Sequence, residues 1–253
     1  MGHGVFMTDP WMPAEMFPGV DLTTTKLPRE VDAIRAAISE AMKLPDHMRD
    51  DQPIGKAVTG IYAFFDYDGE PIYVGQTREN FSSRVGRHMT GMRSDSVGKY
   101  VLDPFEVYAI AMWSLPHIAD EIAPRLQKRE LDKYEYTIHL QLSEQSKFGA
   151  VLNEGTLTIT EVMNDLPDPV RAVIIPNHIF PDRAHPDIRI ARRATTISLL
   201  AKNISERKVS KGLRQALLVQ TRRLEDLAER RVQALAGLPE LLDDDTDSVA
   251  DED

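Results

Sequence analysis

The chain has 253 residues, of which 42% are hydrophobic and 28% charged, and it contains no cysteine. This length suffices for one large domain or a compact domain with appendages, and the composition excludes a disordered chain. The lack of cysteine excludes disulfide scaffolds, thiolate zinc sites and cysteine nucleophiles, which leaves carboxylates, His, Tyr, Arg and an oxygen-liganded metal. Neither an apolar run of membrane-spanning length nor a secretion signal is recognisable, so we expect a cytoplasmic protein that does not enter a membrane.

The net charge of −10 is unevenly distributed along the chain. Residues 183–231 contain 13 Lys or Arg against 5 Asp or Glu, whereas residues 240–253 contain 8 acidic residues and no basic one. This distribution fits a polyanion-binding surface followed by an acidic tail that competes with the polyanion. It fits equally a solvated helix face followed by a solubilising tail.

The first predicted elements are an arm and a helix, which together occupy residues 1–55. Residues 1–27 contain three prolines and little periodicity, which indicates an arm. Over residues 28–44 apolar side chains recur at helical spacing between two prolines, so an amphipathic helix is expected there.

A β-hairpin is predicted next. Residues 58–65 (VTGIYAFF) are rich in β-branched and aromatic side chains, DYDGEP supplies turn residues, and residues 72–74 (IYV) resume the strand pattern. The hairpin opens the segment 56–165, which we interpret as the central domain.

The hairpin is followed by a helix, a strand and a second helix. A short helix is expected over residues 80–88, a strand over 105–113, and a long amphipathic helix over 118–142. Pro124 lies near the start of the long helix, where it is either a kink or a first-turn residue. This order predicts an α/β (α+β) domain, in which a small sheet is flanked by helices.

Residues 166–238 are interpreted as a basic helical region that serves DNA binding, oligomerisation or both. A short strand over residues 172–175 and two helices over 188–200 and 210–235 are expected there. Leucines at helical spacing in the last helix provide apolar positions for packing or dimerisation. Residues 239–253 form an acidic tail that we expect to be disordered, because its charges repel one another and it offers little apolar surface.

A set of glycines, tyrosines and polar residues occurs in a definite order across the central domain. The tripeptide GIY is followed by YVG eleven residues after its tyrosine, then by an Arg and a His four residues apart, and later by Glu and Asn. In content and order this series resembles the GIY-YIG nuclease family over roughly residues 59–153. The residues that carry the resemblance are Gly60, Tyr62, Tyr73, Gly75, Arg84, His88 and Asn153.

These residue types suit phosphodiester hydrolysis on chemical grounds as well. Hydrolysis requires an attacking water and neutralisation of the charge that develops on the phosphate. Arg84 can grip phosphate oxygens with a planar, permanently charged fork, and His88 lies on the same helix face at i+4. A carboxylate from the long helix can hold Mg²⁺, and tyrosine hydroxyls in one cleft can orient a water.

The family resemblance implies a role for each matching residue. Tyr62 would activate or position the water with help from Tyr73, and Arg84 would bind the scissile phosphate. His88 would bind phosphate or shuttle a proton. A Glu would ligate a single Mg²⁺ or Mn²⁺ ion.

The remaining matches are structural. Gly75 would allow close backbone approach, and Gly60 and Asn153 would support the site.

The metal ligand has two candidates on the long helix. Glu135, in the sequence YEYTI, is preferred, and Glu130 is the alternative.

Each of these side chains also has a purely structural interpretation. A buried strand tyrosine is usually a core aromatic, a helical histidine is often solvated, and Glu135 beside Lys133 can be a surface charge. The combined pattern favours the catalytic interpretation.

We therefore expect a Mg²⁺-dependent endonuclease of double-stranded DNA, first of all a restriction-type enzyme that cuts defined sites as a homo-oligomer. A phage, mobile-element or repair nuclease of the same fold is the nearest alternative. Two further alternatives are not enzymes: a catalytically inactive nucleic-acid-binding protein and a structural oligomer. The basic residues expected to contact DNA are Arg189, Arg192, Arg193, Arg207, Lys208, Lys211 and Arg214.

Overall fold

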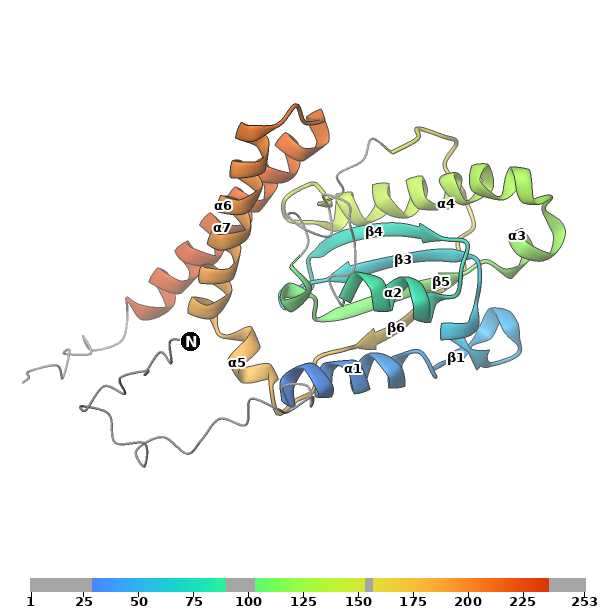
Figure 1. Cartoon of the computed structure of the whole chain (residues 1–253), viewed down its shortest axis with the longest axis horizontal. Coiled ribbons are helices and arrows are strands. Elements are labelled where there is room, and N and C mark those ends of the chain that lie inside the picture. Colours follow the sequence, from blue (N-terminus) through green and yellow to red (C-terminus); the bar gives the residue numbers. More distant parts are fainter. Residues whose placement is uncertain (1–28, 90–102, 153–156, 237–253) are drawn as a thin grey trace, which may run out of the picture.

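The structure is a computed structural model that describes residues 29–89, 103–152 and 157–236. An antiparallel sheet with helices on both faces forms its centre, and a long helical hairpin stands beside one end of this sheet (Figure 1). The predicted α+β fold class is confirmed.

Four strands form the central sheet in the order β4-β3-β5-β6, and every neighbouring pair is antiparallel. In the central strand, Tyr62 lies opposite Gly75 of β4 and Met112 of β5. A two-stranded sheet formed by β1 and β2 precedes it. The strands are β1 (Pro45–Asp46), β2 (Gln52–Pro53), β3 (Gly60–Phe65), β4 (Pro71–Thr77), β5 (Ala109–Ser114) and β6 (Val170–Val173).

Seven α-helices surround the sheet in the described part of the chain. The long α4 lies along one sheet face, while α1 and α2 lie on the other side, and α6 and α7 pair as the helical hairpin (Figure 1). The helices are α1 (Arg29–Ala41), α2 (Phe81–Met89), α3 (Pro116–Glu121), α4 (Pro124–Gln145), α5 (Phe180–Ala184), α6 (Pro186–Glu206) and α7 (Lys211–Leu235).

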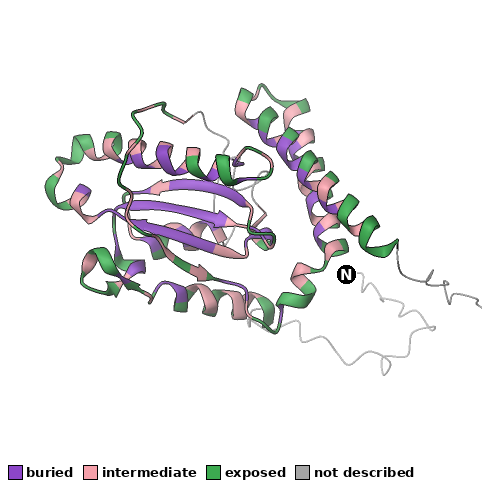
Figure 2. Cartoon of the chain, turned by 180° about the vertical axis from the view of Figure 1, so that it is seen from behind, coloured by how far each residue is buried: buried purple, intermediate pink, exposed green. Residues whose placement is uncertain are grey.

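Both faces of the sheet are buried over β3, β4 and β5, which explains why β3 is a nearly continuous apolar run (Figure 2). On one face, Ile61 and Val74 belong to a core that includes Leu131 and Ile138 of α4. On the other face, Tyr62 and its neighbours belong to a second core to which α1, α2, α6 and α7 contribute. The two-residue period of the strands thus sends Tyr62 to the side opposite α4.

The hairpin, the short helix and the final helix pair are confirmed, but several boundaries differ from the prediction. The long helix is two helices, because the chain leaves helical geometry at Ile122, and Pro124 occupies the first turn of α4. The third strand starts at Ala109, after a 3₁₀ turn over Pro104–Glu106. The short elements β1, β2 and α5 were not predicted from the sequence.

The segment interpreted as a helical appendage also contributes to the sheet. Its strand β6 pairs with β5, so residues from the C-terminal region complete the same sheet that carries the GIY and YVG tripeptides. Within the residues that the structure describes, no helix is both long and apolar enough to cross a membrane.

Candidate active site

Two strand tyrosines and one helix histidine form a buried aromatic cluster on the sheet face opposite α4. The ring centroid of Tyr62 lies 5.9 Å from that of Tyr73 and 5.3 Å from that of His88. Tyr73 and His88 are 5.0 Å apart, and Phe64 joins the same cluster. The structure therefore brings together the two tyrosines and the histidine of the predicted site.

Glycine is required at the middle of this cluster. A Cβ atom at Gly75 would lie 2.7 Å from the Tyr62 hydroxyl oxygen and 2.7 Å from a Tyr73 ring carbon. A Cβ atom at Gly60 would collide with the carbonyl oxygen of Trp113 and with the Phe81 ring. Both glycines thus permit close approach, as the resemblance implied for Gly75.

The Tyr62 hydroxyl is the centre of a hydrogen-bond chain. It lies 2.6 Å from Nε2 of His88, and Nε of Arg84 donates to it at 3.0 Å. Both partners come from α2, where the i, i+4 spacing places them on one helix face. Burial raises the pKa of Tyr62 well above its usual value and Tyr73 adds to this effect, while the Arg84 charge opposes it.

Arg84 connects the buried cluster to solvent. Tyr62 is fully buried and His88 is 2% exposed, whereas the Arg84 side chain is 28% exposed. Its Nε is used by Tyr62 and Nη1 lies 4.0 Å from Glu79, so the exposed end of the guanidinium group remains for another ligand. It faces an open pocket lined by Gln76, Thr77, Arg78, Glu79, Arg84 and Lys128.

Glu135 approaches the pocket from the opposite side of the edge strand. The side-chain amide of Gln76 donates to Glu135 at 2.8 Å and to Asp132 at 2.6 Å. Burial raises the pKa of Glu135 and Asp132 contributes to the rise, while the hydrogen bond from Gln76 and the charge of Arg84 lower it. Glu135 and Arg84 therefore interact electrostatically around β4.

The alternative metal ligand lies in a different environment. Glu130 forms an ion pair with Lys133 at 3.0 Å, and Lys133 also binds Glu161. Of the two candidates, Glu135 is the one that shares an amide donor with a second carboxylate. Asn153, the last residue of the predicted site, lies outside the described residues.

A magnesium ion is compatible with this donor set. Mg²⁺ is usually bound in proteins by one or two carboxylates plus substrate phosphates. Glu135 and Asp132 provide two carboxylates on one helix face, beside an arginine that can receive the phosphate. No group of three or more His, Asp or Glu side chains suited to a metal occurs in the described ranges, so substrate oxygens would be needed to complete the coordination.

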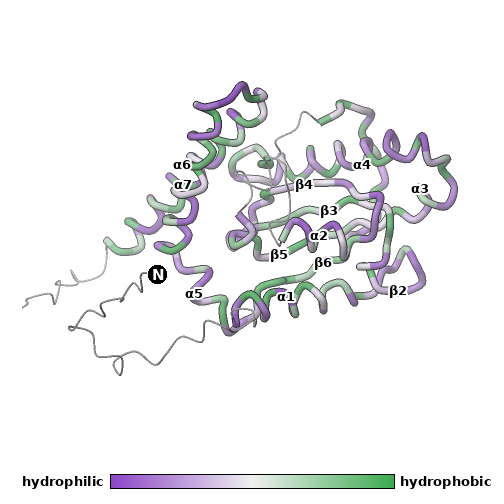
Figure 3. Tube along the Cα trace, viewed as in Figure 1, coloured by the Kyte–Doolittle hydropathy of each residue, from purple (hydrophilic) through white to green (hydrophobic). Residues whose placement is uncertain are grey.

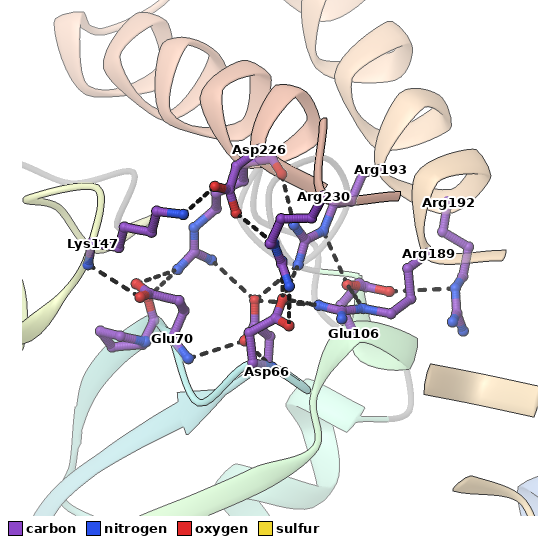
Figure 4. A network of polar contacts seen from close by, with 12 residues as sticks. Asp66, Glu70, Glu106, Lys147, Arg189, Arg192, Arg193, Asp226 and Arg230 are labelled. Atoms are coloured by element: carbon purple, nitrogen blue, oxygen red, sulfur yellow. Dashed lines mark hydrogen bonds and ion pairs between the residues drawn. The ribbon is translucent and has the colours of Figure 1, made fainter. Parts of the chain in front are cut away.

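Three of the seven predicted DNA-binding residues bind other groups of the protein instead of facing solvent. Arg189 and Arg193 are 3% and 5% exposed and reach from α6 to acidic residues of the central domain (Figure 4). Arg193 binds Asp66 at 2.9 Å and Glu106 at 3.2 Å. Arg192 is half-buried, lies 3.5 Å from Glu106 and donates to the Arg183 carbonyl. The predicted DNA contact is wrong for Arg189 and Arg193, since their guanidinium groups are buried against carboxylates.

These arginines belong to a buried ion-pair cluster that fastens the α6–α7 hairpin to the sheet. Asp66 closes the β3–β4 turn by accepting from the backbone N–H groups of Asp68 and Glu70. Its other oxygen lies 2.9 Å from Arg193 and 3.9 Å from Arg223 of α7. The members of the cluster are Asp66, Asp68, Glu70, Glu106, Arg189, Arg193, Arg223 and Arg230.

The other four predicted DNA-binding residues are exposed at the turn between α6 and α7. They are Arg207, Lys208, Lys211 and Arg214, and their side chains form no ion pair with the described residues. The turn is strongly hydrophilic (Figure 3). We refer to these four residues as the basic tip.

Several side chains of the site were not predicted from the sequence, namely Gln76, Arg78, Glu79, Lys128 and Asp132. Strand alternation could have predicted the position of Gln76. Its neighbour Gly75 faces Tyr62, so the next side chain along the strand must face α4. Helical spacing carried the signal for Asp132, which precedes Glu135 by three residues.

Comparison of the chain with protein families, with curated proteins and with solved structures found no match.

Proposed function

We propose that this protein is a Mg²⁺-dependent DNA endonuclease of the GIY-YIG type. The observation that carries the proposal is the hydrogen bonding of one tyrosine hydroxyl to both His88 and Arg84, with Arg84 extending into an open pocket. A buried tyrosine that serves only as a core residue needs a single polar partner. The tyrosine, histidine and arginine side chains instead form a continuous path from the buried cluster to a place where phosphate can bind.

The chain's own residues divide the work of hydrolysis between them. Arg84 binds the scissile phosphate with its terminal nitrogens while its Nε holds the Tyr62 oxygen in place. Arg84 donates to that oxygen, so when Nε2 of His88 carries no proton it accepts the hydroxyl proton of Tyr62. Passage of this proton to His88 leaves the phenolic oxygen able to take a proton from an attacking water.

Glu135, with Asp132 beside it, would hold the magnesium ion or a manganese ion in its place. When bound, the ion neutralises charge that develops on the phosphate. Gln76 keeps both carboxylates oriented toward this role through its amide hydrogen bonds.

The substrate proposed is double-stranded DNA in the cytoplasm, cut at defined sites in the manner of a restriction enzyme that works as a homo-oligomer. The basic tip supplies affinity through phosphate contacts, which carry no sequence information by themselves. A phage, mobile-element or repair role is the alternative with the same chemistry.

The test is incubation of the purified protein with plasmid and phage DNA in Mg²⁺ or in EDTA. We expect discrete fragments that require Mg²⁺ and disappear in Tyr62→Phe and in Glu135→Ala. Loss of cleavage in Glu130→Ala but not in Glu135→Ala would move the metal to Glu130. Tyr67→Phe is the matched control, because the Tyr67 hydroxyl donates to the Phe105 carbonyl, away from the site.

A second candidate, a nucleic-acid-binding protein without cleavage activity, is favoured by one observation. Tyr62 is 0% exposed, so its hydroxyl is enclosed in this conformation. Such a protein would retard DNA in a gel and leave it intact in both Mg²⁺ and EDTA.

A further inference from the structure

The pocket in front of Arg84 contains more positive charge than the proposed reaction uses. Arg78 and Lys128 line it together with Arg84, and Glu79 is its acidic side chain. Glu79 is held in a two-pronged ion pair by Arg87 and lies 4.0 Å from Arg84. The negative charge is thus largely compensated from outside the pocket, so the lining has a cationic excess.

Arg78 is the basic side chain of this pocket that has no structural role in the described residues. It is exposed and makes neither an ion pair nor a hydrogen bond to any residue that the structure describes. Its backbone is nevertheless well fixed, because the Thr77 hydroxyl donates to the Glu79 carbonyl at 2.7 Å and accepts from the Glu79 N–H at 3.1 Å. A free cation is thereby presented on a rigid turn directly between β4 and α2.

Lys128 lies across the same pocket on the first turns of α4. Its ammonium group binds Asp132 at 2.9 Å, and its side chain is still 60% exposed. Since Asp132 also accepts from Gln76, this contact links Lys128 to the carboxylates beside the proposed metal site. Arg78 and Lys128 therefore stand on two different elements around Arg84.

The form of the pocket limits its ligand. Sites for small metabolites are enclosed and mostly apolar, with a few convergent polar groups. Here the lining is polar and charged and the pocket is open, which suits a section of an extended polyanion.

We propose that Arg78 and Lys128 bind the phosphate next to the scissile phosphate on the same DNA strand. This inference rests on the proposed function, in which Arg84 holds the scissile phosphate. It gives the strand a defined path across the C-terminal end of β4. The path is separate from the basic tip, because the arrowhead of β4 points away from the α6–α7 hairpin (Figure 1).

The test measures DNA affinity rather than cleavage. The full-length chain carrying Glu135→Gln, which prevents turnover, is titrated onto a labelled duplex in EDTA at several salt concentrations. We expect Arg78→Gln to reduce the slope of log K against log salt by about 1, the change for one lost phosphate contact. Arg222→Gln is the matched control, because Arg222 is exposed on α7 and is not part of the pocket.

Lys128→Gln is expected to give a similar reduction, but it also frees Asp132, so Arg78→Gln is the decisive variant. An unchanged melting temperature for Arg78→Gln is expected, since its side chain makes no contact that a glutamine would break. A salt slope for Arg78→Gln equal to that for Arg222→Gln would overturn the inference.

The two proposals fail in different ways. If the wild-type protein cuts DNA and Arg78→Gln leaves both KM and the salt slope unchanged, the function stands and the strand path is wrong. If DNA stays intact in Mg²⁺ while Arg78→Gln lowers the slope, the phosphate site stands and the nuclease proposal is wrong. With both correct, Arg78→Gln raises KM and leaves kcat near the wild-type value.

Discussion

The hydroxyl oxygen of Tyr62 lies 2.6 Å from Nε2 of His88, and both residues are buried. A hydrogen bond of this length between a phenol and an imidazole in a low-dielectric environment provides a direct route for a proton. It also gives the buried hydroxyl a second hydrogen-bond partner besides Arg84, which is a structural role. The two roles make different predictions.

Replacement of His88 by Gln distinguishes the proton-transfer role of His88 from its structural role. Glutamine offers a carbonyl oxygen that accepts a hydrogen bond from Tyr62 but cannot take up a proton near neutral pH. If His88 receives the proton, we expect His88→Gln to lower kcat by about 10² or more while DNA affinity is retained. Single-turnover cleavage and gel retardation measure the two quantities. Cleavage within a few-fold of the wild type would assign His88 a structural role only.

Gly75 should tolerate no side chain if the cluster is the active site. A methyl group there would lie 2.7 Å from the Tyr62 hydroxyl oxygen, on a β-strand whose backbone is fixed by pairing with β3. We expect Gly75→Ala to displace Tyr62 from Arg84 and His88 and to abolish cleavage.

The matched control for Gly75→Ala is Gly86→Ala on α2. Apart from the chain neighbours and the backbone of α2 itself, no described atom lies within 4 Å of a Cβ placed at Gly86, and alanine is the better helix former by about 1 kcal/mol. Gly86→Ala should therefore cleave normally and melt at the same or a higher temperature. Full activity in Gly75→Ala would disconnect the tyrosine cluster from catalysis.

The sequence was sufficient to predict this cluster because its members are related by local periodicities. Tyr62 lies in one strand and Tyr73 and Gly75 in the next, so hairpin pairing alone brings them together. Arg84 and His88 are one helical turn apart. Glu135 is distinguished from Glu130 by its tertiary contact with Gln76, which local periodicity does not predict. Glu130 therefore remained an alternative at the level of sequence.

In the basic helical region, by contrast, the sequence could not predict which arginines are buried. Arg193 and Arg207 look alike in sequence, since nothing local distinguishes a buried arginine from a solvated one. The difference arises from Asp66 and Glu106, which lie 127 and 87 residues away from Arg193 along the chain. Asp66 itself reads as an ordinary turn residue in DYDGEP, and its second oxygen becomes an anchor for Arg193 only after the hairpin docks.

Removal of one charge from the ion-pair cluster should destabilise the whole fold. Asp66 is 1% exposed, so Asp66→Asn leaves the buried guanidinium groups of Arg193 and Arg223 without sufficient compensation. Breaking a buried pair from one side typically costs about 3–5 kcal/mol. We expect a loss of this size in the free energy of unfolding measured with urea.

The control for Asp66→Asn is an ion pair at the surface. Arg231 binds Asp187 between α7 and α6, and both side chains are accessible to solvent. Arg231→Gln should hardly change the urea midpoint, because exposed pairs contribute little. Equal effects of the two variants would mean that the buried cluster does not hold the hairpin.

The basic tip should control DNA affinity without controlling where the DNA is cut. Replacing Arg207, Lys208, Lys211 and Arg214 together by Gln removes up to four phosphate contacts, and each contributes about 0.9 to the salt slope. We expect weaker binding, a shallower salt dependence and an unchanged set of cleavage fragments. A changed fragment pattern would show that the tip reads base sequence.

Arg189→Gln and Arg193→Gln provide the contrast with the tip. Because both side chains are buried among carboxylates, these variants should lower the melting temperature far more than the fourfold tip variant does. A stable Arg193→Gln protein with weakened DNA binding would restore the original interpretation of this residue as a DNA contact.

His139 on α4 should make the fold sensitive to moderately acidic pH. Burial lowers the pKa of His139 to about 4, whereas an unfolded chain protonates histidine at a pKa of about 6.5. Above pH 6.5 the side chain is neutral in both states, and its contribution to stability is complete. As the pH falls from 6.5 to 4, the unfolded chain binds the proton first, so stability declines over this window.

The decline is measured as the urea midpoint of the wild type and of His139→Gln at intervals between pH 7 and pH 4. Carboxylates of the unfolded chain also begin to bind protons toward pH 4, so the difference between the two proteins isolates the histidine. We expect the wild type to lose more stability than His139→Gln across the window. His178→Gln serves as the control for the replacement of an exposed histidine by glutamine. Parallel curves for the wild type and His139→Gln would mean that protonation of His139 is accommodated in the folded protein.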